Sequence, residues 1–146
     1  MILAIDPGTI KSGIAIIEND GQLVMKTIIA TENLEKEIIT LLTKYLVHVI
    51  VSGNGTNHKA VKKRLTELLK AENISLSIEL VNEKYTTEMG EEWYWKDHKP
   101  KGWKRIIPKG FRTVPVPIDD YVAWIIGNIY IGRIKEEDVN HKKNIN

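Results

Sequence analysis

The sequence has no cysteine among its 146 residues, and this absence excludes disulfide bonds, thiolate zinc sites and catalysis by a thiol. The four histidines are scattered and do not show the spacing of metal ligands. No apolar run approaches the roughly 20 residues that cross a bilayer, so we expect no membrane span. The N-terminus lacks a basic segment followed by a long apolar stretch, so we also expect no signal peptide and a cytoplasmic location.

The composition is that of an ordinary globular protein, with 42% apolar and 27% charged residues and a net charge of only +2. A chain of this length forms one domain with a proper core. The sequence contains neither an internal repeat nor a composition that marks a linker. We therefore predict one domain over residues 1–135, followed by a polar tail over residues 136–146 that frays.

The hydrophobic pattern predicts an α/β fold. Residues 2–6, 13–18 and 22–30 form an antiparallel meander in this prediction, with a tight turn at residues 19–21. Helices are then expected over 32–46 and from about 59, alternating with strands over 47–52 and 76–82. Thr86 or Thr87 is a plausible N-cap for a third helix ending near 95, residues 96–117 form a loop, and a last helix covers 118–133. This order predicts a mixed five-stranded sheet, three antiparallel strands and then two parallel ones, flanked by helices.

Three acids fall where the ends of strands and helices can converge. Asp6 ends the first apolar strand, Glu83 follows the last strand, and Asp119 begins the final helix with Asp120 beside it. A carboxylate at the end of a buried strand is costly unless something pairs with it. Each acid also has a simpler interpretation. Asp6 can hold the turn at residues 7–8, Glu83 can be a solvated strand end, and Asp119 can suit the helix dipole.

Convergent carboxylates repel one another, and a divalent cation relieves the repulsion. Ligands that are all oxygens favour Mg²⁺ or Mn²⁺. Two such ions can clamp the attacking and leaving oxygens of a phosphodiester. We therefore predict Asp6, Glu83 and Asp119 as catalytic residues and metal ligands, with Asp120 as a further candidate ligand.

Basic residues gather late in the chain. Residues 96–112 include seven basic residues and only one acid, and Trp93, Trp95 and Trp103 lie among or next to them in the sequence. Basic groups neutralise phosphates and aromatic rings stack on unpaired bases, so this segment is predicted to grip nucleic acid. In the alternative, the tryptophans are partly core and the lysines are solvated. Trp124, in the last helix, is predicted to serve packing. Asn57 is predicted either to help seat a phosphate or to serve only as an N-cap. The residues expected to contact nucleic acid are Thr9, Lys11, Asn57, Lys84, Lys101, Trp103, Lys104, Arg105, Lys109 and Arg112.

Four sequence blocks span nearly the whole chain, from about residue 2 to 133. They are Ile5-Asp6-Pro7-Gly8-Thr9 with Gly13-Ile14-Ala15, Ile50-Val51-Ser52-Gly53 with Asn57, Asn82-Glu83-Lys84-Tyr85-Thr86-Thr87, and Ile118-Asp119-Asp120-Tyr121-Val122-Ala123. Together they resemble the YqgF-type (RuvX) family of the RNase H-like superfamily, which includes Holliday-junction resolvases and pre-16S rRNA nucleases. The chain departs from the family pattern at Asn82 and Lys84, where the family has Asp and Arg, and at Asn54-Gly55, where it has Leu-Pro.

The resemblance implies an RNase H-like fold whose acids fall on Asp6, Glu83 and Asp119. It implies a metal-dependent endonuclease that hydrolyses phosphodiester bonds in structured nucleic acid, either Holliday-junction DNA or an rRNA precursor, and leaves a 5′-phosphate. A junction resolvase is expected to act as a homodimer. Two competitors remain. One is an inactive RNase H-like module that only binds nucleic acid. The other is an actin-like ATPase, which shares the Asp-Pro-Gly-Thr turn but needs two such domains around its nucleotide.

Overall fold

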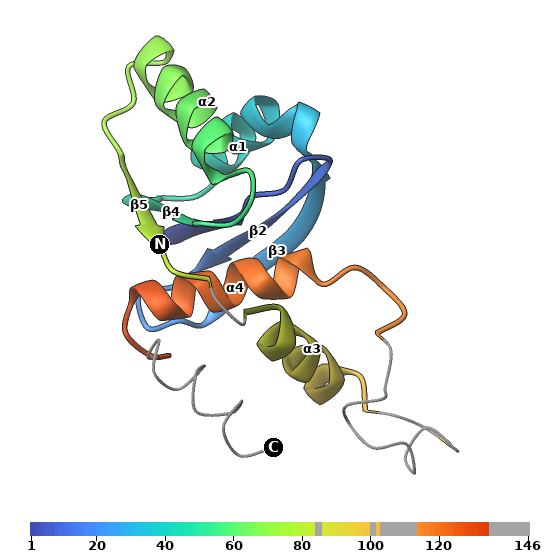
Figure 1. Cartoon of the computed structure of the whole chain (residues 1–146). Coiled ribbons are helices and arrows are strands. Elements are labelled where there is room, and N and C mark those ends of the chain that lie inside the picture. Colours follow the sequence, from blue (N-terminus) through green and yellow to red (C-terminus); the bar gives the residue numbers. More distant parts are fainter. Residues whose placement is uncertain (84–85, 100–101, 103–113, 135–146) are drawn as a thin grey trace.

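A single mixed sheet of five strands forms the centre of the structure, a computed structural model that describes residues 1–83, 86–99, 102 and 114–134 (Figure 1). The strands lie in the order β3-β2-β1-β4-β5. Strand β1 pairs antiparallel with β2, which pairs antiparallel with β3, while β1, β4 and β5 run parallel. The predicted mixed sheet is therefore confirmed. The strands are β1 (Ile2–Asp6), β2 (Lys11–Ile17), β3 (Leu23–Ala30), β4 (Val49–Gly53) and β5 (Ser77–Val81).

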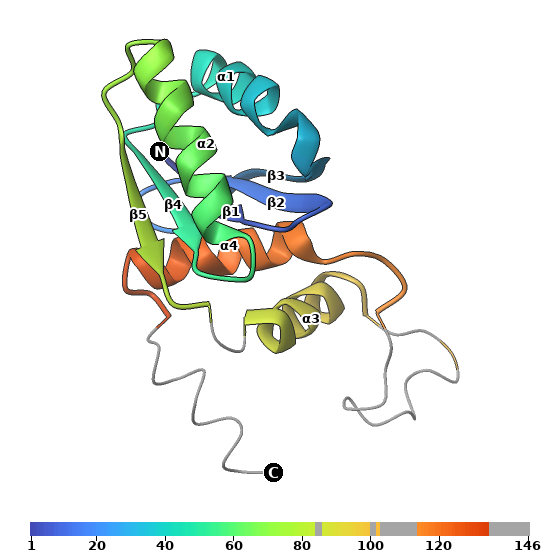
Figure 2. The same ribbon diagram turned by 45° about the horizontal axis from the view of Figure 1, so that its top comes forward.

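Helices cover both faces of the sheet (Figures 1 and 2). Helices α1 (Leu34–Lys44) and α2 (His58–Ala71) pack on one face over a core that includes Leu3, Ile50 and Leu65. Helix α4 (Asp119–Tyr130) lies along the other face over a second core that includes Ala4 and Val51. Because β1, β2 and β4 are covered on both sides, their residues are nearly all buried, as is usual for central strands.

Helix α3 (Thr86–Asp97) packs against α4 and not against the sheet (Figure 2). Gly90 allows this approach, because an added Cβ would lie 3.1 Å from a methyl group of Val122 and 3.3 Å from one of Ile118. Trp93 of α3 is consequently placed beside Trp124 of α4.

Several predicted boundaries were wrong by a few residues. A 3-10 turn at Thr31–Asn33 precedes α1, and α3 continues through Lys96 to Asp97, where a loop was predicted. Thr86 is the first residue of α3 and not its N-cap, because its hydroxyl donates to the Glu83 carbonyl 2.7 Å away. Among the described residues, no helix is long and apolar enough to cross a membrane.

The register brings the ends of four elements to one edge of the sheet. Ile5 pairs with Ser52 and Gly53 with Val81, so Asp6 and Glu83 follow the same ends of parallel strands. Asp6 also pairs with Gly13, where an added Cβ would lie 1.8 Å from the backbone oxygen of Asp119. The glycine therefore lets the first turn of α4 approach the strand that neighbours Asp6.

Candidate active site

The turn after Asp6 is held rigidly by hydrogen bonds. The Gly8 N–H donates to Ser12 Oγ at 3.2 Å, and the Gly8 carbonyl accepts from Thr31 Oγ1 and Asn57 Nδ2, both at 2.9 Å. Since the Thr31 hydroxyl donates to Gly8, the 2.7 Å contact between Ser12 Oγ and Thr31 Oγ1 has Ser12 as donor. An added Cβ at Gly8 would lie 1.9 Å from the Lys11 carbonyl oxygen, so only glycine fits the turn.

Asp6 and Glu83 form a hydrogen-bonded pair of carboxyl groups. Burial, together with the nearby charges of Glu83 and Asp119, raises the pKa of Asp6 to about 8. Burial also raises the pKa of Glu83, although the charge of His58 and the hydrogen bond from Asp6 oppose this shift. A hydrogen bond between two carboxyl groups needs a proton that the two share. The pair thus holds one proton near neutral pH in the absence of a cation.

The Glu83 carboxylate lies in a narrow space between two glycines. An added Cβ at Gly53 would lie 1.9 Å from Glu83 Oε2, and one at Gly55 would lie 1.7 Å from Oε1. The Glu83 backbone N–H donates to Asn54 Oδ1 at 3.1 Å, which ties the residue to the same loop. Glu83 Oε2 is buried and has no hydrogen-bond partner among the described residues. The loop therefore fixes the carboxylate and leaves one oxygen available.

The two adjacent aspartates of α4 have different surroundings. Asp119 Oδ2 lies 3.4 Å from Lys11 Nζ, and its charge is felt at Asp6. Asp120 Oδ2 lies 2.6 Å from Lys26 Nζ on β3, and its Oδ1 accepts from the Tyr121 N–H at 2.9 Å. Asp6, Glu83 and Asp119 are thus brought together, and we call them the acidic edge. Asp120 faces β3 instead.

Three of the residues predicted to contact nucleic acid surround the acidic edge. Thr9 is exposed on the turn between β1 and β2, and Lys11 is exposed as the first residue of β2. Asn57 is at the N-cap position of α2, but its side chain donates to Gly8 and makes no cap hydrogen bond. It braces the Asp6 turn. The others lie outside the described residues: Lys84, Lys101, Trp103, Lys104, Arg105, Lys109 and Arg112.

Sequence reasoning missed His58 at this edge. Its Nδ1 lies 2.7 Å from the Gly55 carbonyl, which can only accept, so Nδ1 carries a proton and Nε2 is directed elsewhere. Its charge affects Glu83. The scattered histidines gave no signal, because this contact depends on how the loop after β4 passes the end of β5. The glycine spacing at residues 53–55 was the available sign that a side chain would pack there.

The donor set of the acidic edge fits a hard divalent cation. All three side chains offer oxygen, their charges repel, and Glu83 Oε2 lacks a donor, so a cation would relieve each of these costs. The arrangement is not preassembled. Among the described residues, no group of three His, Asp or Glu side chains is grouped closely enough to hold an ion. For all three acids to share one ion, their side chains must come closer together.

The mixed five-stranded sheet with helices on both faces is an RNase H-like fold. Over residues 1–88 the sequence matches the family model described as the Tex protein YqgF-like domain. The chain belongs to this family of YqgF-like domains. No functionally curated sequence matches it.

Solved structures with the same fold include two of RuvC and one viral resolvase. Thermus thermophilus RuvC matches at a TM-score of 0.50, both in complex with a Holliday junction substrate (12% identity, 90% of this chain and 95% of that chain) and in a second structure (11%, 92% and 96%). The Fowlpox virus resolvase, in complex with Holliday junction DNA, matches at 0.54 (16%, 92% and 100%). At these identities the likeness establishes the fold.

Proposed function

We propose that this protein is a metal-dependent endonuclease that cuts structured nucleic acid at the acidic edge. The observation that carries the proposal is the buried Asp6–Glu83 pair, whose raised pKa values mark carboxylates that a cation would ionise. Perturbed carboxylates of this kind concentrate at functional sites. The relation to a junction resolvase fold supports the same chemistry.

Asp6, Glu83 and Asp119 would hold Mg²⁺ or Mn²⁺ at this edge. When bound, such ions polarise a phosphodiester and supply a nucleophile from water. The protein itself holds the carboxylate ligands in position. Gly53 and Gly55 fix the Glu83 carboxylate, and the braced turn fixes Asp6. Lys11, once Asp119 turns to a cation, is left at the edge with a free charge for a phosphate.

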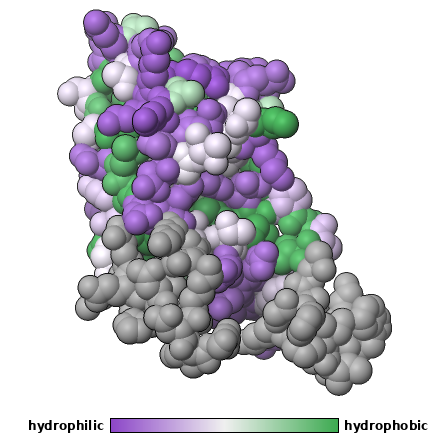
Figure 3. Space-filling model, in the orientation of Figure 1, coloured by the Kyte–Doolittle hydropathy of each residue, from purple (hydrophilic) through white to green (hydrophobic). Residues whose placement is uncertain are grey.

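A row of lysines next to the acidic edge supports a nucleic-acid substrate. Lys59, Lys62 and Lys63 are exposed on one face of α2, and we call them the α2 ridge. The ion pairs between described residues do not involve them. The first turn of α2 carries no acid and follows the loop that holds Glu83. Figure 3 shows that the surface over α1 and α2 is mainly hydrophilic. The ridge suits a phosphate backbone leaving the edge.

The test is a cleavage assay with Mg²⁺ or Mn²⁺ on a four-way DNA junction, a hairpin RNA and linear duplexes of both kinds. We expect cleavage of a branched or hairpin substrate, loss of cleavage in Asp6→Asn, and 5′-phosphate ends. Binding without cleavage under all conditions would overturn the proposal and leave an RNase H-like module that only binds.

Reversing the charge of two lysines tests whether the α2 ridge contacts the substrate. Lys59→Glu with Lys62→Glu should weaken binding and lower the slope of log affinity against log salt by roughly 2, about 0.9 for each lost phosphate contact. Lys36→Glu with Lys44→Glu, on the exposed face of α1, is the matched control and should change neither quantity much. Equal effects of the two double variants would argue against the α2 ridge.

A further inference from the structure

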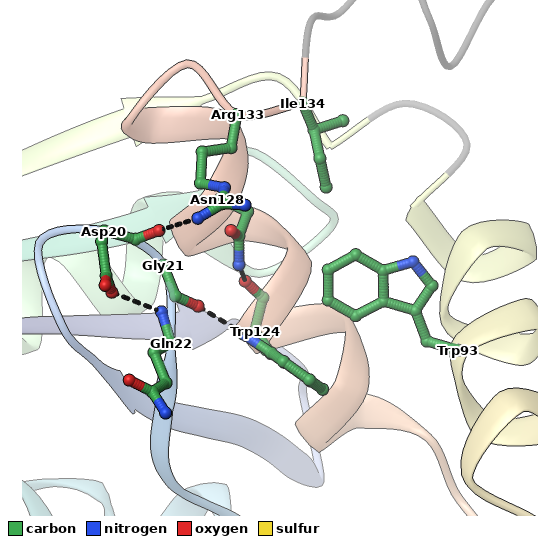
Figure 4. A pocket seen from close by; sticks show the side chains of 8 residues that line it. All are labelled: Asp20, Gly21, Gln22, Trp93, Trp124, Asn128, Arg133 and Ile134. Carbon is green, nitrogen blue, oxygen red and sulfur yellow. Dashed lines mark hydrogen bonds between the residues drawn. The ribbon is translucent and has the colours of Figure 1, made fainter.

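A cavity of about 470 Å³ lies beside α4, and none of its lining residues belongs to the acidic edge. Figure 4 shows the residues that line it. The cavity is bounded by the C-terminal half of α4, by α3 and by the turn between β2 and β3. Its size, and its aromatic walls with a few polar groups, lie within the range of ligand pockets. The lining residues, which we call the tryptophan cavity, are Asp20, Gly21, Gln22, Trp93, Trp124, Asn128, Arg133 and Ile134.

Two tryptophans from different helices form the aromatic wall. Trp93 of α3 and Trp124 of α4 meet edge to face, with ring centroids 4.6 Å apart. The Trp124 indole N–H donates to the Gly21 carbonyl at 3.1 Å, which fixes its ring against the turn (Figure 4). Both side chains are only half-buried although each is large and apolar. A second planar ring entering the cavity would cover them further.

The polar side of the cavity offers donors to a base or a phosphate. Arg133 is exposed and gives one N–H to the Asp20 carbonyl. A guanidinium carries five N–H donors, so Arg133 retains others for a ligand. The Asn128 amide donates to the Trp124 carbonyl at 2.9 Å and presents its oxygen near Gly21. Stacking surfaces beside an arginine are the usual means of holding an unpaired base.

Helix α4 connects the tryptophan cavity with the acidic edge. Asp119 is its first residue, and Asn128 follows nine positions later. At 1.5 Å per residue the two positions are about 14 Å apart along the helix axis. That length corresponds to roughly four nucleotide steps of 3.4 Å along one strand.

We propose that the tryptophan cavity binds an unpaired nucleobase of the substrate strand, roughly four nucleotides from the bond cut at the acidic edge. The inference rests on the proposed function, because the base belongs to the nucleic acid that the edge cuts. The site would give the enzyme a preference for substrates with an unpaired base at that distance, such as the flank of a branch point or a loop.

The test measures the affinity of the whole chain, in a chelator, for branched substrates that carry one abasic site at successive positions. We expect one abasic position to weaken binding roughly 5- to 100-fold, the range of losing one stacked base. Abasic sites elsewhere should have little effect. Trp93→Leu should abolish this position dependence, and Trp93→Tyr should retain part of it. Trp95→Leu, from a residue of the same helix that does not line the cavity, is the control.

The outcomes separate this inference from the proposed function. Binding and cleavage without any abasic position dependence would overturn the inference and leave the nuclease intact. If adenosine monophosphate alone changes the tryptophan fluorescence while abasic sites have no effect, the ligand is a free nucleotide and the inference is again overturned. Failure to bind any nucleic acid would overturn both proposals. Because the abasic series uses the unmodified protein, it stays decisive even if Trp93→Leu does not fold.

Discussion

Helix α4 begins among carboxylates and ends among tryptophan and amide side chains, and these two ends are stabilised differently. At the C-terminal end the Trp124 indole and the Asn128 amide each donate to a carbonyl. At the N-terminal end Asp119 approaches a buried pair of carboxyl groups, of which one oxygen has no partner among the described residues. The first arrangement lowers the free energy of the fold, whereas the second raises it. Uncompensated charge of this kind is typical of a functional site.

Replacing Asp119, at the N-terminal end of α4, should have the largest effect on cleavage. Asp119→Asn keeps the size of the side chain but removes a carboxylate that we assign to catalysis. We expect cleavage to fall roughly 10⁴-fold, the loss that follows when a single catalytic aspartate is changed to asparagine. Rates on a junction substrate in Mn²⁺ are the measurement. Melting temperature should change little, because removing a charge that repels Asp6 offsets the loss of the contact with Lys11.

Ionisation of the buried Asp6 should make the metal-free protein less stable as pH rises. The pKa of Asp6 is about 8 in the fold against 3.8 for an ordinary aspartate, so the fold binds a proton that the unfolded chain has lost. Stability from this group is full below about pH 4 and is lost as pH rises through about 8. Urea unfolding in a chelator should therefore show a free energy of unfolding lower by a few kcal/mol at pH 8 than at pH 5.

Asp6→Asn provides the control for this pH dependence, since an amide cannot ionise. The variant should be more stable than the parent protein at pH 8 and show little decline between pH 5 and 8. Adding Mn²⁺ should restore stability to the parent at pH 8 but not to the variant. An equal decline in both proteins would show that Asp6 is not the group responsible.

The fold was predictable because its signals are local and periodic. Apolar strands, the Asp20-Gly21 turn and the helical spacing of apolar residues each indicated an element, and chain order then limited the topology. The order of the elements does not reveal that α3 packs on α4, because that depends on which helix face is left uncovered. Gly90 permits the contact, but a glycine within a helical pattern does not by itself indicate which neighbour packs against it.

Asp6 and Glu83 could be singled out because each follows a strand, and parallel strands end at one edge. The partners of Glu83 were not predictable in the same way. Asn54 accepts from the Glu83 N–H, and the charge of His58 acts on Glu83, because the loop after β4 turns back over the end of β5. That path is set by long-range packing. The different surroundings of Asp119 and Asp120 depend on the rotation of α4 about its axis, which the pattern of apolar residues defines only within about one residue.

A side chain added at Gly55, one of the two glycines around the Glu83 carboxylate, tests how tightly that carboxylate is held. Gly55→Ala would place a methyl group 1.7 Å from Glu83 Oε1, so the carboxylate must move. Since catalysis depends on position, we expect cleavage to fall roughly 10- to 100-fold, the usual cost of disturbing a group that orients a metal ligand. Thr56→Ala, at the exposed neighbouring position, should leave the rate unchanged. An equal loss of cleavage in Thr56→Ala would mean that any change in the loop lowers the rate, and not the contact between Gly55 and Glu83.

The smallest effect is expected for Asp120→Asn, which separates the two adjacent acids of α4. The change removes an ion pair that joins α4 to β3 and leaves the half-buried Lys26 ammonium without its carboxylate. Lys26 also lies 4.0 Å from the centroid of the Tyr121 ring, a contact that remains and limits the loss. Stability should fall by about 1–2 kcal/mol while cleavage stays within a few fold of the parent rate. Lys26→Met in the same chain should recover part of the stability, since no charge is then left unpaired. A large loss of cleavage with unchanged stability would place Asp120 at the acidic edge and remove the distinction between the two acids.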